Sequence, residues 1–439
     1  PINGTIISLP FKLTDANNRL VSRINAYYSL NGGGQWLPAI ATAGTATTNL
    51  ATSPGGITYN YNWDLTASGF FGKSDNVVFR IEAVPDVRAK ANSVPGPYLY
   101  GSYASSTFPF RVRGTQVRVM QNGSPVSGAL VYRIPAGQSR GGTLFADASG
   151  TPFKTDSQGY LQGRGELQVG DQLVALREVS KITKPNSQQL IYTVYHTNAA
   201  PTATGLAAYT VTTGGVQTLN VSQANPLILF NVVVSLEWDA RNDAQYLAQL
   251  ESDLKRTSEA LFDWTNGQAA LGQVTIYQDR EHWNDADVQI RASNRLRPNA
   301  ALGGSVNQKT NDPQVSTIAY VPGQVRIGAT WNRFGDAGSN LGEDWPRALA
   351  HELAHYFLFV DDNYLGLDSN NFLIAVNTCP GAMSDPYRTD SYAEFHPDAN
   401  WTNECGSTLA HTGGGRSDWS SGKPFHPRLP TPTSPIGGR

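Results

Sequence analysis

The segment at residues 227–238 (LILFNVVVSLEW) is a nearly continuous apolar run, which is typical of a strand buried on both faces of a sheet. After it, Asn242 or Asp243 is expected to cap a helix that runs to about Trp264. Leucines recur there on one stripe, at Leu247, Leu250, Leu254 and Leu261. Further strand-like segments follow at 273–278, 287–291, 315–321 and 324–331. This order predicts an α/β or α+β domain.

Two β-rich segments precede that domain. Residues 1–113 hold alternating runs, such as 23–30 and 77–83, separated by Gly, Asn and Ser clusters. Trp36, Tyr61 and Trp63 are spaced as core aromatics of a sandwich. We therefore expect a multidomain chain: two all-β sandwich modules at 1–113 and 114–225, an α/β (α+β) domain at 226–422, and a tail or linker with five prolines at 423–439.

The charge balance of the 439 residues restricts the classes of partner. Lys and Arg number 33 against 35 Asp and Glu, a net charge of −2. Such a chain lacks the basic excess typical of nucleic-acid binders, so no nucleic-acid partner is expected. No apolar run approaches ~18 residues, so no membrane span is expected either. Because the chain starts at Pro1 with no leader, we expect a mature or excised piece.

The two cysteines, Cys379 and Cys405, indicate the compartment. In a reducing compartment they would be two thiols, whereas in an exported protein they would form one disulfide. Closing a loop of this size would stabilise the fold by roughly 3–4 kcal/mol in the chain-entropy model. Low charge and Thr/Ser/Asn-rich turns favour export, so we expect an extracellular or cell-surface protein.

Residues 351–355 (HELAH) carry the chemistry. On a helix, positions i and i+4 share a face, so His351 and His355 can reach one zinc ion. Glu352 lies one residue on, beside the metal, where it can take a proton from a zinc-bound water. The common metzincin pattern HExxHxxGxxH would place Gly at Leu358 and a third His at Asp361, and neither is present.

The segment resembles the protease domain of the CLCA family (calcium-activated chloride channel regulators) and its bacterial relatives, within the metzincin clan. Their motif, HExxHxxxGxxDE followed by Tyr, implies Asp362 as third metal ligand and matches Tyr364. Phe359 stands for the family's Gly and Asn363 for its Glu. Asp361 remains the alternative third ligand. It is otherwise a candidate to orient a histidine.

The resemblance extends over roughly residues 227–420. Met383, in residues 379–384 (CPGAMS), implies a Met-turn beneath the metal, although simple core filling is the alternative. Residues 391–395 also match, as do upstream landmarks at 263–268, 274–276 and 286–288. Other candidate residues carry weaker signals. His282 is expected at the surface, and His396 and His411 are expected as substitute ligands, cleft residues or satisfied structural histidines. Tyr387 is a candidate oxyanion or switch residue, and Glu394 is expected to anchor the downstream loop rather than to act as a second acid.

The β-rich segments have resemblances of their own. Residues 123–132 (GSPVSGALVY), 155–161 (TDSQGYL) and 169–176 (VGDQLVAL) resemble transthyretin-like, carboxypeptidase regulatory-like modules. Residues 28–33 (YSLNGG) and 61–64 (YNWD) are similar to fibronectin/Ig-type modules. These resemblances imply binding or structural roles.

Together these features predict an extracellular zinc endopeptidase with one catalytic Zn²⁺ and a protein or peptide substrate. The substrate is expected to lie as an extra strand along residues 324–330. Self-processing is a trait that the resemblance implies. The alternative is a surface structural, adhesive or filament-forming protein with a degenerate or purely self-cleaving protease domain, whose β-modules bind cell-surface or self-assembly partners. A non-proteolytic zinc hydrolase is a third hypothesis. Calcium is left open but unsupported, because the acidic residues are scattered and form no EF-type loop.

Overall fold

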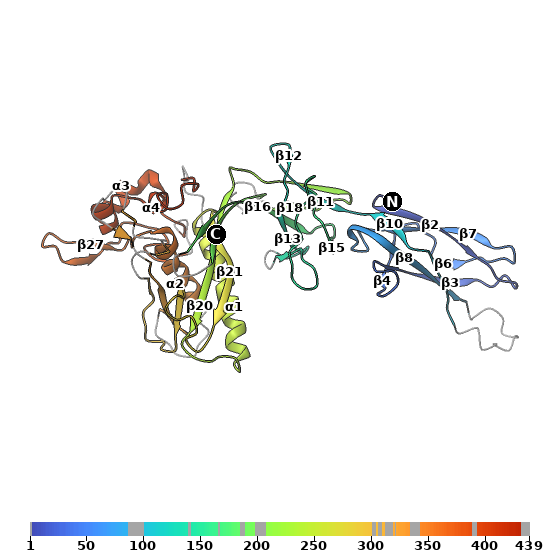
Figure 1. Ribbon diagram of the computed structural model, residues 1–439, viewed down its shortest axis with the longest axis horizontal. Coiled ribbons are helices and arrows are strands. Elements are labelled where there is room, and N and C mark those ends of the chain that lie inside the picture. Colours follow the sequence, from blue (N-terminus) through green and yellow to red (C-terminus); the bar gives the residue numbers. More distant parts are fainter. Residues whose placement is uncertain are drawn as a thin grey trace. The chain divides into compact units, whose positions relative to one another are not determined.

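The chain forms two compact units (Figure 1). The first contains Pro1–Arg177 and Ala208–Ser222, and the second Glu178–Ala207 and Gln223–Arg439. The computed structural model describes residues 2–86, 101–138, 142–165, 167–184, 189–197, 208–300, 304–305, 310–311, 319–320, 322–333, 343–388 and 393–431. Over these residues the protein is β-rich, with several sheets and few helices.

The described part of the first unit is built from strands alone. They are β1 (Ile2–Asn3), β2 (Ile6–Leu13), β3 (Val21–Ser29), β4 (Leu37–Pro38), β5 (Ile40–Ala41), β6 (Thr48–Leu50), β7 (Ile57–Asp64), β8 (Phe71–Pro85), β9 (Tyr103–Ser106), β10 (Phe110–Arg113), β11 (Gln116–Gln121), β12 (Ser124–Pro125), β13 (Leu130–Ile134), β14 (Thr143–Leu144), β15 (Arg164–Gly165), the start of β16 (Gln172–Thr183), β18 (Tyr209–Thr210) and β19 (Val216–Asn220). The order β1-β10-β8-β3-β4 forms one sheet and β2-β7-β5 another, while β11 lies between β12 and β19.

Aromatic side chains form the core of this unit. Alternate residues of β7 face inward, so Tyr61 and Trp63 are buried. The Trp63 ring centroid lies 4.9 Å from that of Tyr28 and 5.2 Å from that of Phe79. The prediction for Trp36 was wrong, because its ring is half-buried and lies under the Arg80 guanidinium, 4.4 Å from its centroid. A cation over an indole face is favourable where water still reaches it.

The second unit combines a mixed sheet with helices. Its strands are the end of β16, β17 (Leu190–His196), β20 (Pro226–Leu236), β21 (Ala269–Tyr277), β22 (Val288–Arg291), β23 (Asn299–Ala300), β24 (Thr310–Asn311), β25 (Ala319–Tyr320), β26 (Val325–Gly328), β27 (Leu365–Leu367) and β28 (Leu373–Ala375). Its helical segments are α1 (Ala244–Trp264), α2 (Asp344–Leu353), the π-helical turns η1 (Ala354–Leu358) and η3 (Ala410–Gly414), the 3₁₀ turn η2 (Asp398–Asn400), α3 (Trp401–Cys405) and α4 (Asp418–Gly422). β20 is parallel to β21 and β22, and β22 is parallel to β26.

The predicted strand and helix at 227–264 are confirmed. Nearly every residue of β20 is buried, which fits a strand covered on both faces. The Asp243 carboxylate accepts the Tyr246 N–H and caps α1. Leu250, Leu254 and Leu261 are buried in the core that the sheet and the helices share. Figure 1 shows α1 running beside β20 and β21 as the crossover between these parallel strands.

The second helix, α2, begins with an acidic turn. Glu343 occupies the N-cap position without a side-chain cap, and Asp344 is the first helical residue. Asp344 still lies in the first turn, where a carboxylate is favoured by the helix dipole. The Trp345 indole donates to Gly328 O at 2.8 Å and thereby fastens α2 to β26.

Three further predictions need correction or comment. The predicted edge at 324–330 is covered in part, because β23 pairs antiparallel with β26 through Asn299↔Arg326 and Ala300↔Val325 and forms the outer strand at these residues. Of the predicted strand at 315–321, only β25 lies within the described residues. At the predicted tail, residues 423–431 pack on the second unit, with Leu429 buried and the His426 ring donating to Phe357 O at 2.9 Å. Residues 432–439 lie outside the described part.

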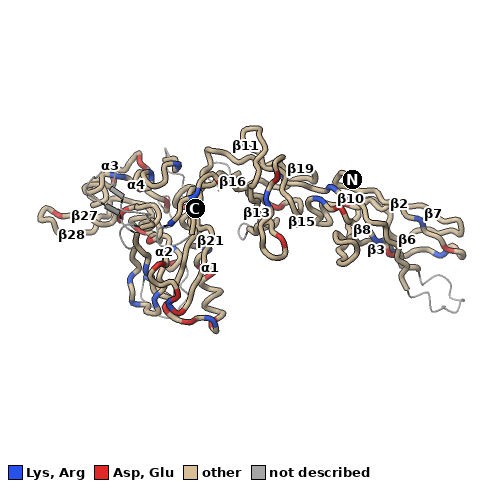
Figure 2. The backbone as a smooth tube through the Cα atoms, viewed as in Figure 1, with Lys and Arg blue, Asp and Glu red and all other residues tan. Residues whose placement is uncertain are grey.

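The charged residues follow no single-sign stripe. Figure 2 shows Lys/Arg and Asp/Glu interspersed along the described chain. Among the helices that the structure describes, none has the length and apolar character needed to cross a bilayer.

Candidate metal centre

Two backbone carbonyls orient the histidines of the HELAH segment. His351 lies near the end of α2, and its Nδ1 is 3.2 Å from Ala382 O. His355 lies in the π-helical turn η1, and its Nδ1 contacts Val360 O. A carbonyl oxygen only accepts hydrogen bonds, so Nδ1 carries the proton in both rings. The Nε2 lone pairs are therefore free for a cation, as in metal-binding histidines whose other nitrogen is held by a second partner.

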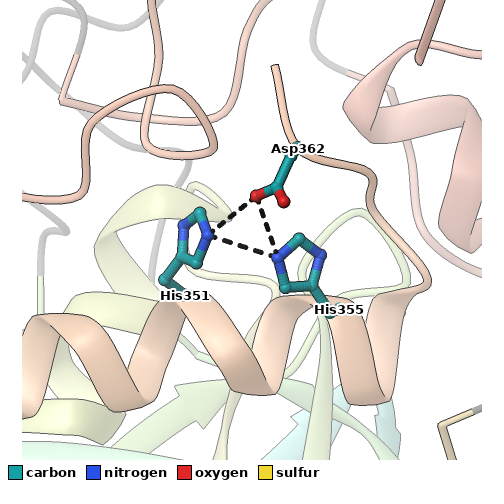
Figure 3. Close-up of side chains that lie close together, drawn as sticks. All are labelled: His351, His355 and Asp362. Atoms are coloured by element: carbon teal, nitrogen blue, oxygen red, sulfur yellow. Dashed lines mark hydrogen bonds and ion pairs between the residues drawn. The ribbon is translucent and has the colours of Figure 1, made fainter. Parts of the chain in front are cut away.

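The two Nε2 atoms converge with a carboxylate oxygen (Figure 3). His351 Nε2 lies 3.1 Å from Asp362 Oδ1 and 3.2 Å from His355 Nε2, and the third side of the triangle is 3.2 Å. Tetrahedral ligands held about 2.0–2.1 Å from zinc are themselves about 3.3–3.4 Å apart. The two imidazoles and the carboxylate therefore fit zinc in both chemistry and spacing. Three lone pairs that face one another repel unless a positive charge lies among them.

A tight turn returns the chain to the histidines. Phe359, which stands where the resembled motif has Gly, adopts the left-handed region with φ 59°. A bulky residue is uncommon there. Its ring stacks on Phe425 with centroids 3.7 Å apart, a contact that helps to offset the backbone cost. The turn therefore forms without glycine and leads directly to Asp362.

The structure brings Asp362, and not Asp361, to the histidines. Asp361 is exposed and does not belong to the cluster. The next residue, Asn363, is fully buried and holds the ligand loop in place. Its backbone N–H donates to Met383 O at 3.1 Å, and its side-chain amide donates to Asp418 Oδ1 at 2.9 Å. Met383 is buried in the core beside Ala382, which orients His351.

Asp418 was not foreseen, because it lies 55 residues after Asn363 and no spacing in the sequence links the two. Its carboxylate also accepts the His396 backbone N–H at 2.8 Å. Burial raises the pKa of Asp418 to about 6, although both hydrogen bonds oppose the shift. Asp418 thus holds Asn363, the residue next to Asp362, in place.

Electrostatics at the cluster favour a cation. Burial lowers the pKa of His355, but the Asp362 carboxylate outweighs burial and raises that pKa to about 9. Burial likewise opposes ionisation of Asp362, yet the two histidines, which donate from Nε2 when they carry a second proton in place of a metal, hold its pKa well below the ordinary value. The carboxylate thus stays anionic and attracts positive charge to its neighbours.

Glu352 lies in a cleft beside the three donors. Its side chain is buried and accepts the Ala300 backbone N–H. Burial raises the pKa of Glu352, which the histidine charges partly oppose. The cleft has a volume of about 1180 Å³. Its lining residues are Ser293, Asn294, Arg295, Arg297, Pro298, Trp331, Asn332, Arg333, Ala348, His351, Glu352, Tyr364, Ser384, Asp385, Pro386 and Tyr387. Tyr364 and Tyr387 are therefore both positioned to meet a ligand in this cleft.

The remaining candidates have structural surroundings. His396 bonds to Glu404 Oε2 and Pro397 O, each at 2.8 Å, and it lies outside the cluster, as does His411. His282 is exposed beside Asp285. Glu394 is buried, and its backbone carbonyl accepts the Ala382 N–H, which fits a loop anchor. Residues 391–392 of the resembled segment lie outside the described residues.

Cys379 and Cys405 form the expected disulfide, with Cα atoms 4.5 Å apart. Both cysteines are buried, together with Trp401 and Ala410, in a small apolar cluster. The disulfide closes the segment that contains Met383 and the carbonyl that orients His351.

Comparisons with known proteins leave the family open. No family model matches this chain, and no curated protein matches it. Among solved structures, the crystal structure of the Actinomyces fimbrial adhesin FimA is similar over 48% of this chain and 92% of that chain, at 14% identity and a TM-score of 0.15. A likeness at that TM-score carries no inference about this protein.

Proposed function

We propose that the second unit is a zinc-dependent endopeptidase with a metzincin-like site, similar to the CLCA protease domain. The observation that carries the proposal is the convergence of His351 Nε2, His355 Nε2 and Asp362 Oδ1 beside Glu352. Zinc bound by these three atoms would polarise a scissile carbonyl and acidify water. The disulfide supports an extracellular or cell-surface location.

Glu352 is the acid–base group of the proposed reaction. It lines the cleft with His351, and the Ala300 N–H fixes its carboxylate. From this position it takes a proton from the attacking water and then delivers that proton to the leaving nitrogen. Glu352 is not itself a ligand, so its removal affects proton transfer and leaves the donor triangle intact.

The test compares the wild-type chain with Glu352→Gln on unfolded casein and on the chain itself. Loss of the base is expected to lower cleavage by about 10²–10⁴-fold. Arg241→Gln, at an exposed residue paired with Asp239 and outside the cleft, is the matched control and keeps wild-type cleavage. Equal cleavage by wild type and Glu352→Gln would sink the proposed role. Absence of cleavage by the wild type would favour the surface-protein alternative.

A further inference from the structure

Two cleft arginines have no carboxylate partner among the described residues. Arg295 and Arg297 are exposed, and their guanidinium groups make no hydrogen bond or ion pair within the described chain. The third cleft arginine, Arg333, is engaged: it lies 3.5 Å from Asp344 Oδ1, and its guanidinium is 4.6 Å from the Tyr387 ring centroid. The free positive charge of the cleft wall is thus concentrated on one loop.

That loop is anchored at both ends. Asn294 Oδ1 accepts the Thr330 N–H at 3.2 Å, just beyond β26. At the other end, Asn299 and Ala300 form β23 and pair with β26. The two arginines are therefore held on a short segment against a sheet edge, and a ligand that binds them orders little additional chain.

The loop also lies close to the proposed catalytic group. The Ala300 N–H donates to Glu352, and Arg297 is only three residues before Ala300. Three residues of fully extended chain span at most about 10 Å, so the Cα atoms of Arg297 and Ala300 lie within that distance. The Arg297 backbone is therefore close to the residue that donates to Glu352, and both Arg297 and Glu352 line the same cleft.

Among the described residues, no ion pair joins these arginines to the acidic residues that line the cleft. Glu352 is bonded to Ala300, and Asp385 Oδ1 accepts the Tyr387 N–H at 3.0 Å within its own turn. A guanidinium binds a carboxylate in a two-pronged, charge-assisted geometry, which makes arginine suited to select Asp or Glu.

We propose that Arg295 and Arg297 select peptides that carry an Asp or Glu side chain next to the scissile bond. The inference rests on the proposed peptidase function for its biological sense, whereas the binding preference is measurable without cleavage. Because both arginines are exposed to water, the preference is modest. We expect about 2- to 5-fold tighter binding of a Glu peptide than of its Gln counterpart at low salt, and a smaller ratio at high salt.

The experiment measures peptide binding to the full-length Glu352→Gln chain in the presence of zinc. Fluorescein-labelled peptide mixtures carry Glu, Gln or Lys at one central position, with randomised flanking residues, and Kd is read by anisotropy at 50 and 500 mM NaCl. The Glu preference is expected to vanish in Arg295→Gln/Arg297→Gln, to turn toward Lys in Arg297→Glu, and to persist in Arg241→Gln. The double variant also shows whether acidic peptides bind through the metal alone.

Equal Kd values for the Glu and Gln mixtures, or a Glu preference that survives in the double variant, would overturn the inference. So would failure to bind any of the mixtures. Cleavage of the same mixtures by the wild-type chain tests the peptidase proposal separately. A Glu preference in binding without any cleavage would refute the peptidase and leave the anion-binding site standing. Cleavage without a Glu preference would support the peptidase and refute the anion-binding site.

Discussion

A buried ion pair beneath the proposed metal centre offers a quantitative test of the second unit. Lys184 Nζ contacts Asp287 Oδ2, and the two side chains are 1% and 4% exposed. Asp287 Oδ2 also accepts the Val233 N–H at 2.7 Å, and Oδ1 accepts the Tyr356 hydroxyl at 2.7 Å. Tyr356 follows the proposed ligand His355 in η1, so this network supports the turn that carries the ligand.

Lys184→Met keeps the aliphatic bulk of the side chain and removes the ammonium group. Asp287 then remains buried with two neutral donors and no counter-charge. Breaking one partner of a buried pair costs about 3–5 kcal/mol. In urea, with an m-value of about 2–3 kcal/mol/M, the midpoint of the second unit's transition should fall by roughly 1–2 M. Zinc affinity should fall as well, because η1 loses its support.

Lys255→Met is the matched control, since Lys255 pairs with Glu251 while both side chains remain largely exposed, at 70% and 66%. An exposed helix pair contributes about 0.3–0.5 kcal/mol, so this variant should barely move the midpoint. A Lys184→Met midpoint within experimental error of that of Lys255→Met would refute the reasoning. The reasoning would also be refuted if the double variant Lys184→Met/Asp287→Leu were no more stable than Lys184→Met. This follows because the loss of stability is attributed to the unpaired Asp287 carboxylate.

Three further predictions concern the disulfide, acid and the third ligand. Replacing Cys379 and Cys405 with Ser should lower the free energy of unfolding by about 3–4 kcal/mol, because the bond closes a loop with a sequence separation of 26; chemical denaturation checks this, and a change below about 1 kcal/mol would contradict it. Burial lowers the pKa of His426 to about 4. In the unfolded chain the pKa of His426 is about 6.5, so the unfolded state binds the proton first as the pH falls. The free energy of unfolding is therefore highest above pH 6.5 and falls by about 3 kcal/mol toward pH 4. Denaturation at several pH values should show a smaller acid-induced fall in His426→Gln, and equal slopes for the two chains would count against the assignment. Asp362→Asn should weaken zinc binding by at least about tenfold in a competition titration, whereas Asp361→Asn, its immediate neighbour, should leave Kd unchanged; the opposite ranking would make Asp361 the ligand.

Local patterns in the sequence predict much of the second unit. The continuous apolar run predicts the buried strand β20, and the helical spacing of the leucines predicts α1. Asp243 belongs to a residue type that commonly caps a helix, so the start of α1 was also predictable. The spacing of His351 and His355 likewise predicts that both face one point, and the structure brings their Nε2 atoms within 3.2 Å.

What sequence reasoning could not reach depends on contacts between distant residues. The choice between Asp361 and Asp362 depends on a turn at Phe359 whose ring stacks on Phe425. Lys184 and Asp287 are 103 residues apart, and no pattern links them before the chain folds. The covered edge of β26 was missed for a different reason: β23 contains only two residues, too few to show any periodicity.

The measurement that tests the central claim most directly is the zinc content of the purified chain, determined by native mass spectrometry together with casein cleavage. We predict one zinc per chain in the wild type and in Glu352→Ala, with cleavage by the wild type alone, because Glu352 lies beside the three donors and is not one of them. Zinc in both chains without cleavage by either would leave a structural metal site. An absence of zinc from both would contradict the ligand assignment to His351, His355 and Asp362.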